Sequence, residues 1–302
     1  MPALVAALAL AGLAASCARP VVHADEPGAR GPLPEAVGAP WDEGAEWDEG
    51  AEWDEWDDGA EWGDGAAWDE WDDDSEWDDD AEPLASFSID GDGLDPGDAP
   101  PDVAASAAGI WRRFTELIPA DQRTMLDGFE LLPESYGGAH VYPSDRDPSR
   151  GIMGIGLGLR DELDATLIHE FGHLLTLQAK EVPPGSDDRG CTTYFTGEGC
   201  ALSGSTFADY VKQFWPEHLI DEVAELEHSG DQDAADAFYE RHRDAFVTDY
   251  ATTNPAEDLA ETFTAFVMGE RPGGSTIAEQ KIAFLWDDPD MVTLRDRIRA
   301  AL

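Results

Sequence analysis

The chain has 302 residues and a formal net charge of −48 at pH 7, from 66 acidic and 18 basic residues. Of the acidic residues, 22 lie between Trp41 and Glu82, together with eight of the 11 tryptophans. The remainder is also acidic, so we expect no nucleic acid as a partner, because phosphate binding needs clustered Lys and Arg.

The N-terminus predicts an exported protein. Residues 3–15 form an apolar run that is too short to span a bilayer and is followed by small residues. The "LAASC" stretch resembles a bacterial lipobox, although Ala14 stands where Leu is commonest. We therefore expect residues 1–17 to form a signal peptide and Cys17 to carry a lipid anchor to a membrane of the cell envelope. Ordinary signal-peptidase cleavage would instead give a freely secreted protein.

Residues 18–101 are predicted to be a disordered linker. They contain an Ala-, Pro- and Gly-rich tether and then the acidic Trp repeat, whose tryptophans are surrounded by mutually repelling carboxylates. Such a repeat cannot build a core, so a single folded domain is expected at 102–302. The alternative that the repeat itself holds cations or basic partners stays open.

The folded domain is expected to be α+β, mainly helical with a small sheet. Residues 103–118 show apolar residues at helical spacing before Pro119, and a second helix is expected at 122–132. Residues 137–159 predict a strand, a turn and a second strand.

Glycines alternate with apolar residues in that second strand. Gly154, Gly156 and Gly158 share one face, which indicates close approach by another backbone. We interpret it as an edge strand lining a cleft, where an extended peptide could pair. The alternative is a strand packed tightly under a helix.

The cysteines indicate one disulfide. Cys191 and Cys200 lie nine residues apart in the Gly-rich stretch "CTTYFTGEGC", and Cys17 is the third cysteine of the chain. A Cys191–Cys200 disulfide would leave Cys17 for acylation. Two free thiols are the alternative.

The stretch "HEFGH" indicates a metal site. It lies in a predicted helix that ends near Gln178. Four residues advance about 400° along a helix, so His169 and His173 project from one face and can reach one ion. Glu170 stands beside them, where it could contact a metal-bound water.

A later helix can supply the missing ligand. Asn254 and Pro255 predict its start, and Glu257 and Glu261 share one of its faces. A carboxylate from Glu257 would complete three ligands and leave a fourth position open, while Glu261 could accept the free N–H of a ligating imidazole. The alternative makes Glu257 a capping-box residue and Glu261 a surface charge.

These motifs, with Tyr250 seven residues before Glu257, resemble the gluzincin zinc metallopeptidases. The chain is similar in particular to the catalytic domain of anthrax lethal factor and to bacterial zinc-binding metallopeptidase lipoproteins. The resemblance implies a zincin-like fold with its small sheet next to the "HEFGH" helix. It also implies one Zn²⁺ per chain, bound by His169, His173 and Glu257, with Glu261 behind the ligands.

The implied activity is hydrolysis of peptide bonds in a peptide or protein substrate. A zinc-bound water would attack, Glu170 would be the general base, and Tyr250 would assist the transition state. The separation of 84 positions between His173 and Glu257 is longer than in lethal factor, so substrate specificity is not carried over. The alternative function is a surface-anchored, non-catalytic binding or adhesion protein that retains the fold.

Overall fold

The computed structural model describes residues 82–159, 162–185 and 188–302. The expected signal peptide, Cys17 and the linker as far as residue 81 lie outside these ranges. Within the described residues, no helix combines the length and the apolar character needed to cross a bilayer.

The fold is α+β. Its single sheet in the described part of the chain has the strand order β2-β1-β3-β5-β4. Strands β3 and β5 pair in parallel, and the other neighbours pair antiparallel. The strands are β1 (Ala85–Asp90), β2 (Gly93–Asp95), β3 (Leu126–Leu132), β4 (Ala139–Pro143) and β5 (Gly151–Gly156).

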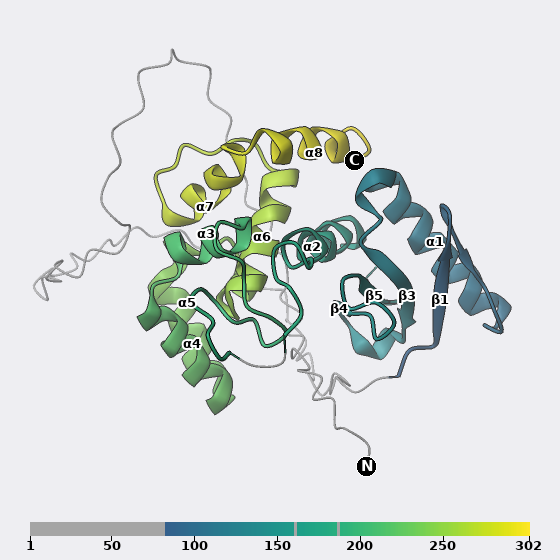
Figure 1. Cartoon of the computed structure of the whole chain (residues 1–302), viewed down its shortest axis with the longest axis horizontal. Coiled ribbons are helices and arrows are strands. Elements are labelled where there is room, and N and C mark those ends of the chain that lie inside the picture. Colours follow the sequence, from purple (N-terminus) through teal and green to yellow (C-terminus); the bar gives the residue numbers. More distant parts are fainter. Residues whose placement is uncertain (1–81, 160–161, 186–187) are drawn as a thin grey trace, which may run out of the picture.

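Helices cover the sheet and form a second layer beside it (Figure 1). Helix α1 packs on the sheet, where the rings of Trp111 and Phe129 lie 5.6 Å apart. Helix α2 lies between the sheet and the remaining helices (Figure 1). The α-helices are α1 (Pro101–Leu117), α2 (Leu163–Thr176), α3 (Thr206–Phe214), α4 (Glu217–Ser229), α5 (Gln232–His242), α6 (Pro255–Met268), α7 (Ile277–Trp286) and α8 (Pro289–Arg299). Short 3-10 turns are η1 (Ala120–Gln122), η2 (Glu134–Tyr136), η3 (Arg243–Ala245) and η4 (Tyr250–Thr252).

Two sequence predictions about these elements are wrong. The boundary at residues 101 and 102 is too late, because β1 and β2 already belong to the sheet and β1 pairs with β3. The expected helix at 122–132 is largely strand β3. The apolar residues of this segment occur at helix-like intervals, but β3 lies inside the sheet, and a strand covered on both faces loses the alternation that would identify it.

The edge strands are β2 and β4, and the prediction that the Gly-rich strand β5 lies at the edge is wrong, because β5 lies between β3 and β4. The glycine face of β5 is filled by its neighbour. A Cβ on Gly154 would lie 2.3 Å from Nε2 of His140, which pairs with it across the strands. A Cβ on Gly156 would lie 2.7 Å from the carbonyl oxygen of Gly138. These glycines therefore make room for β4 and the turn before it.

The "HEFGH" helix and the later helix pack directly on one another. A Cβ on Gly172 of α2 would lie 3.3 Å from the Cα of Ala260 on α6, so a glycine here lets the two helices approach closely. The Phe171 and Phe263 rings, 6.0 Å apart, continue this interface. This close crossing brings the two halves of the predicted site together.

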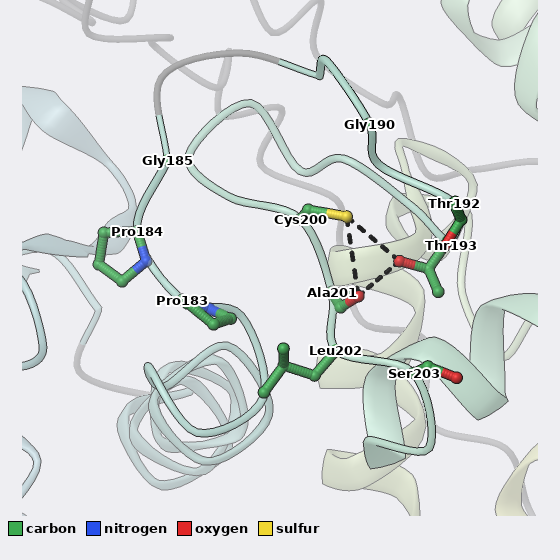
Figure 2. Close-up of a pocket in the computed structure, with 10 residues that line it drawn as sticks. All are labelled: Pro183, Pro184, Gly185, Gly190, Thr192, Thr193, Cys200, Ala201, Leu202 and Ser203. Atoms are coloured by element: carbon green, nitrogen blue, oxygen red, sulfur yellow. Dashed lines mark hydrogen bonds between the residues drawn. The ribbon is translucent and has the colours of Figure 1, made fainter.

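The segment between α2 and α3 contains the predicted disulfide, which joins Cys191 to Cys200. The prediction is confirmed. A pocket beside this bond is lined by Pro183, Thr193 and Leu202 among others (Figure 2). The described residues that line it include no His, Asp or Glu.

Candidate metal centre

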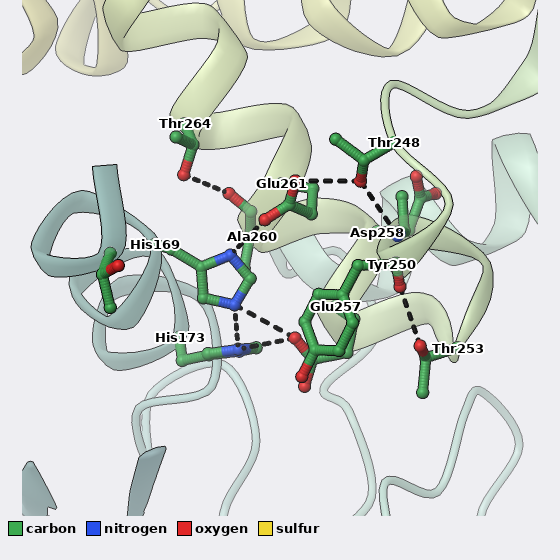
Figure 3. A network of polar contacts seen from close by, with 12 residues as sticks. His169, His173, Thr248, Tyr250, Thr253, Glu257, Asp258, Ala260, Glu261 and Thr264 are labelled. Atoms are coloured by element: carbon green, nitrogen blue, oxygen red, sulfur yellow. Dashed lines mark hydrogen bonds and ion pairs between the residues drawn. The ribbon is translucent and has the colours of Figure 1, made fainter. Parts of the chain in front are cut away.

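Three ligand atoms from two helices converge in the interior of the domain (Figure 3). Nε2 of His169, Nε2 of His173 and Oε2 of Glu257 each lie 3.1 Å from the other two. All three side chains are buried, and Glu257 is only 2% exposed. The structure therefore brings together the three residues expected to bind metal.

The start of α6 aims Glu257 at the imidazoles. The side chain of Asn254 accepts hydrogen bonds from the backbone N–H groups of Ala256 at 2.8 Å and Glu257 at 3.1 Å, and Pro255 occupies the first turn. The Glu257 carboxylate contacts both histidines and makes no bond to the Asn254 backbone in the described structure. The capping-box interpretation of Glu257 is therefore wrong.

The opposite side of the same helical turn is anchored by Asp258. Its carboxylate accepts hydrogen bonds from the Tyr210 hydroxyl and the Trp215 indole N–H, both at 2.8 Å, and pairs with the Lys281 ammonium at 2.8 Å. Asp258 and Lys281 are fully buried, and the ammonium also lies 3.9 Å from the centre of a phenyl ring, that of Phe246. This cluster holds the first turn of α6 against α3 and α7.

Glu261, one turn after Glu257, orients His169. The Nδ1–H of His169 donates to Oε1 of Glu261 at 2.7 Å, and the Thr248 hydroxyl donates to Oε2 at 2.9 Å. With its proton on Nδ1, the ring directs the Nε2 lone pair towards Glu257 and His173. Glu261 is thus a hydrogen-bond partner behind a ligand atom, and the surface-charge interpretation is wrong.

The electrostatics of the cluster favour a cation at its centre. Burial opposes charge on His169 and Glu257, yet their mutual interactions prevail: the pKa of His169 is raised well above its ordinary value and the pKa of Glu257 is lowered. In their metal-binding protonation states, all three converging atoms are lone-pair donors, and a cation between them would compensate their mutual repulsion.

The spacing suits a metal ion. Three atoms that lie 3.1 Å from one another can all reach a single ion at the usual ligand distance of about 2.0–2.1 Å. The buried group of His169, His173 and Glu257 could therefore hold a metal ion.

Glu170 is a buried carboxylate without a hydrogen bond on one oxygen. The side chain is 4% exposed, and Oε2 has no hydrogen-bond partner among the described residues. Burial raises the pKa of Glu170, although the nearby histidines lower it in part. A carboxylate with a raised pKa beside a metal cluster is suited to accept a proton.

Tyr250 lies at the same cluster. Its ring centre is 5.9 Å from that of His169, and it belongs to the short turn η4 just before α6 (Figure 3). Burial and the Glu257 carboxylate raise the pKa of Tyr250, so the hydroxyl stays protonated and can donate a hydrogen bond.

Sequence reasoning missed one part of the surroundings. Glu198, inside the disulfide loop, lines a groove that is also lined by His173, one of the three residues that could hold a metal ion. No periodicity or known spacing marks this residue. Its position just before Cys200 is a sequence signal that could have suggested a fixed location, since the disulfide restrains the loop.

Comparison with known proteins adds no relative: no protein family model, curated protein or solved structure matches the chain. The functional interpretation therefore depends on the residues and their geometry.

Proposed function

We propose that the protein is a zinc-dependent peptidase with a zincin-like, gluzincin-type catalytic domain. The observation that carries this proposal is the convergence of two imidazole nitrogens and one carboxylate oxygen at 3.1 Å, beside the buried carboxylate of Glu170. A purely structural zinc site would have four protein ligands and no need of a base.

The donor set favours zinc. Two neutral imidazoles and one carboxylate, with a fourth position open, are typical of catalytic Zn²⁺. When bound, zinc would polarise the scissile carbonyl and lower the pKa of a water molecule in the site. One Zn²⁺ per chain is expected.

The residues of this chain would then divide the remaining work. Glu170 would accept the proton of the attacking water on Oε2 and later deliver it to the leaving amine. The Tyr250 hydroxyl would donate a hydrogen bond to the oxygen that becomes negatively charged. Glu261 would hold His169 in the tautomer that ligation requires.

The substrate would be an extended peptide. Strand β4 is one edge of the sheet and packs against α2, so this edge lies close to the helix that carries His169 and His173. A peptide paired with this edge would pass along the site. The edge-strand role first assigned to β5 thus passes to β4.

The location of the protein is also part of the proposal. The signal-peptide pattern and the lipobox-like end at Cys17 support export and a lipid anchor in the cell envelope, with secretion as the alternative. The protein would then meet peptide or protein substrates outside the cytoplasm.

The decisive experiment replaces Glu170 with Gln in the full chain. Metal analysis should find one zinc per chain in both proteins, while cleavage of casein and of a peptide library falls by about 10²–10⁴-fold in the variant. Glu225→Gln, an exposed substitution on α4, is the matched control and should keep full activity.

Two results would reject the proposal. Retained cleavage in Glu170→Gln would remove this residue from the mechanism. Stoichiometric zinc in a wild-type chain that cleaves nothing would favour the non-catalytic binding or adhesion protein.

A further inference from the structure

A groove leads away from the metal centre along the C-terminal half of α2. It begins at His173 and continues past Leu174 and Leu177, with Val141 of the edge strand on the facing wall. The walls are therefore largely aliphatic. Two charged side chains also line this groove, Arg150 and Glu198.

The positive charge of Arg150 is already engaged. Its guanidinium forms an ion pair with Asp127 at 3.1 Å and donates a hydrogen bond to the carbonyl oxygen of Leu126. An anionic ligand would have to compete with the Asp127 carboxylate for this arginine. The groove is therefore poorly suited to a negatively charged group.

Glu198, by contrast, has an unused charge. Its carboxylate makes no hydrogen bond or ion pair with any described residue, and its pKa is raised because the groove partly desolvates it. The loop that carries it is well held: the Cys191–Cys200 disulfide closes it, and Gly199 forms a β-bridge with Pro184. The carboxylate thus has a defined place at the groove.

The charge of the whole domain favours the same kind of ligand. Residues 83–302 contain 41 acidic and 16 basic residues. A field of this sign raises the local concentration of cationic molecules. Glu198 would provide a carboxylate beside the metal centre with which such a cation could form an ion pair.

We propose that Glu198 is a specificity-determining residue and that the groove binds a cationic group of the substrate. The methylene stem of a Lys or Arg side chain would lie along Leu174 and Leu177, and its charged head would pair with Glu198. A free α-amino group has the same chemistry and is the other source of the cation. The inference rests on the proposed peptidase function and extends it to a substrate class.

The experiment compares peptides that carry lysine or norleucine, a side chain of similar length without the charge, at each position around the cleaved bond. Each peptide is made with a free and with an acetylated N-terminus. The values of kcat/KM are measured for the full chain, and dissociation constants are measured with Glu170→Gln.

We expect a preference for lysine over norleucine on the order of fivefold, the range of a partly exposed ion pair. Glu198→Gln should abolish the preference, and Glu198→Lys should transfer it to glutamate-containing peptides. Asp188→Asn is the matched control: it removes an exposed acid from the same connecting segment but does not line the groove, so the preference should persist. If kcat/KM instead falls on acetylation and is the same for lysine and norleucine, the bound cation is the N-terminal amine, and Glu198→Gln should remove the effect of acetylation.

Three outcomes would overturn the inference. In the first, the wild-type chain shows no preference for cationic peptides, or the preference survives in Glu198→Gln. In the second, the preference falls equally in Asp188→Asn. In the third, Glu198→Gln loses zinc, which would mean that Glu198 acts through His173. A chain that cleaves no peptide would instead refute the proposed function, and the dissociation constants would still test the groove.

Discussion

The hydrogen bond between His169 and Glu261 allows a graded test of the metal centre. We expect Glu261→Gln to weaken zinc binding about 10–100-fold, which corresponds to about 1.4–2.7 kcal/mol. The carboxylate accepts the Nδ1–H at 2.7 Å, so it both holds the ring and increases the donor strength of Nε2. A neutral amide would hold the His169 ring less firmly and would increase the donor strength of Nε2 less.

Two further substitutions bracket this effect. Glu257→Gln should weaken zinc binding more than Glu261→Gln, because it replaces a charged ligand, which lies 3.1 Å from both imidazole nitrogens, with a neutral amide. Thr248→Val should weaken zinc binding by less than about tenfold, because the Thr248 hydroxyl affects His169 only through its 2.9 Å hydrogen bond to Glu261. The expected order of loss is therefore Glu257, Glu261 and Thr248.

The assay is competition with a chromophoric zinc chelator at constant pH, with circular dichroism to confirm that each variant is folded. Glu225→Gln on the exposed face of α4 serves as the control for loss of one negative charge. If Glu261→Gln weakened zinc binding more than Glu257→Gln, the ligand role would pass to Glu261. If Thr248→Val exceeded Glu261→Gln, the reasoning about the hydrogen bond would be refuted.

Three other predictions concern the packing and protonation of the same region. Lys281→Met should lower the free energy of unfolding, measured by urea titration, by about 3–5 kcal/mol, because it leaves the buried Asp258 carboxylate without its cation. The double variant with Asp258→Asn should recover much of this loss, because it also removes the unpaired charge. Gly172→Val should lower the free energy of unfolding by about 1–3 kcal/mol and also weaken zinc binding, because the valine side chain would push α2 away from α6. Gly109→Ala on α1 is the control: its methyl group would meet open space, so the substitution should stabilise the helix. Zinc uptake at pH 7 should release protons, measured as a dependence of the calorimetric heat on the buffer, because the raised pKa of His169 keeps its imidazole protonated in the metal-free chain. In that metal-free chain, the stability contributed by the charged His169 is complete below about pH 6.5 and is lost as the pH rises through the folded pKa. A Lys281→Met chain as stable as the wild type, a Gly172→Val chain with unchanged zinc affinity, or zinc uptake without proton release would each contradict the corresponding argument.

Local sequence patterns were sufficient to predict the parts of the site that depend on local geometry. A spacing of four residues in a helix places His169 and His173 on one face, and Asn254 followed by Pro255 starts α6 where expected. The nine-residue spacing of Cys191 and Cys200 likewise predicted the disulfide. These features extend over one or two turns of chain, so the residues within them are sufficient to decide the outcome.

The position of each strand in the sheet and the start of the domain depend on contacts between distant parts of the chain. Strand position depends on hydrogen bonds between segments far apart in the chain, so β5 was misplaced and β3 was mistaken for a helix. The place of Glu198 beside His173 also depends on how the disulfide loop folds back on α2. His173 and Glu257 are 84 positions apart in the chain and meet because α2 packs closely on α6 at Gly172 and Ala260, a contact between surfaces that no local pattern encodes.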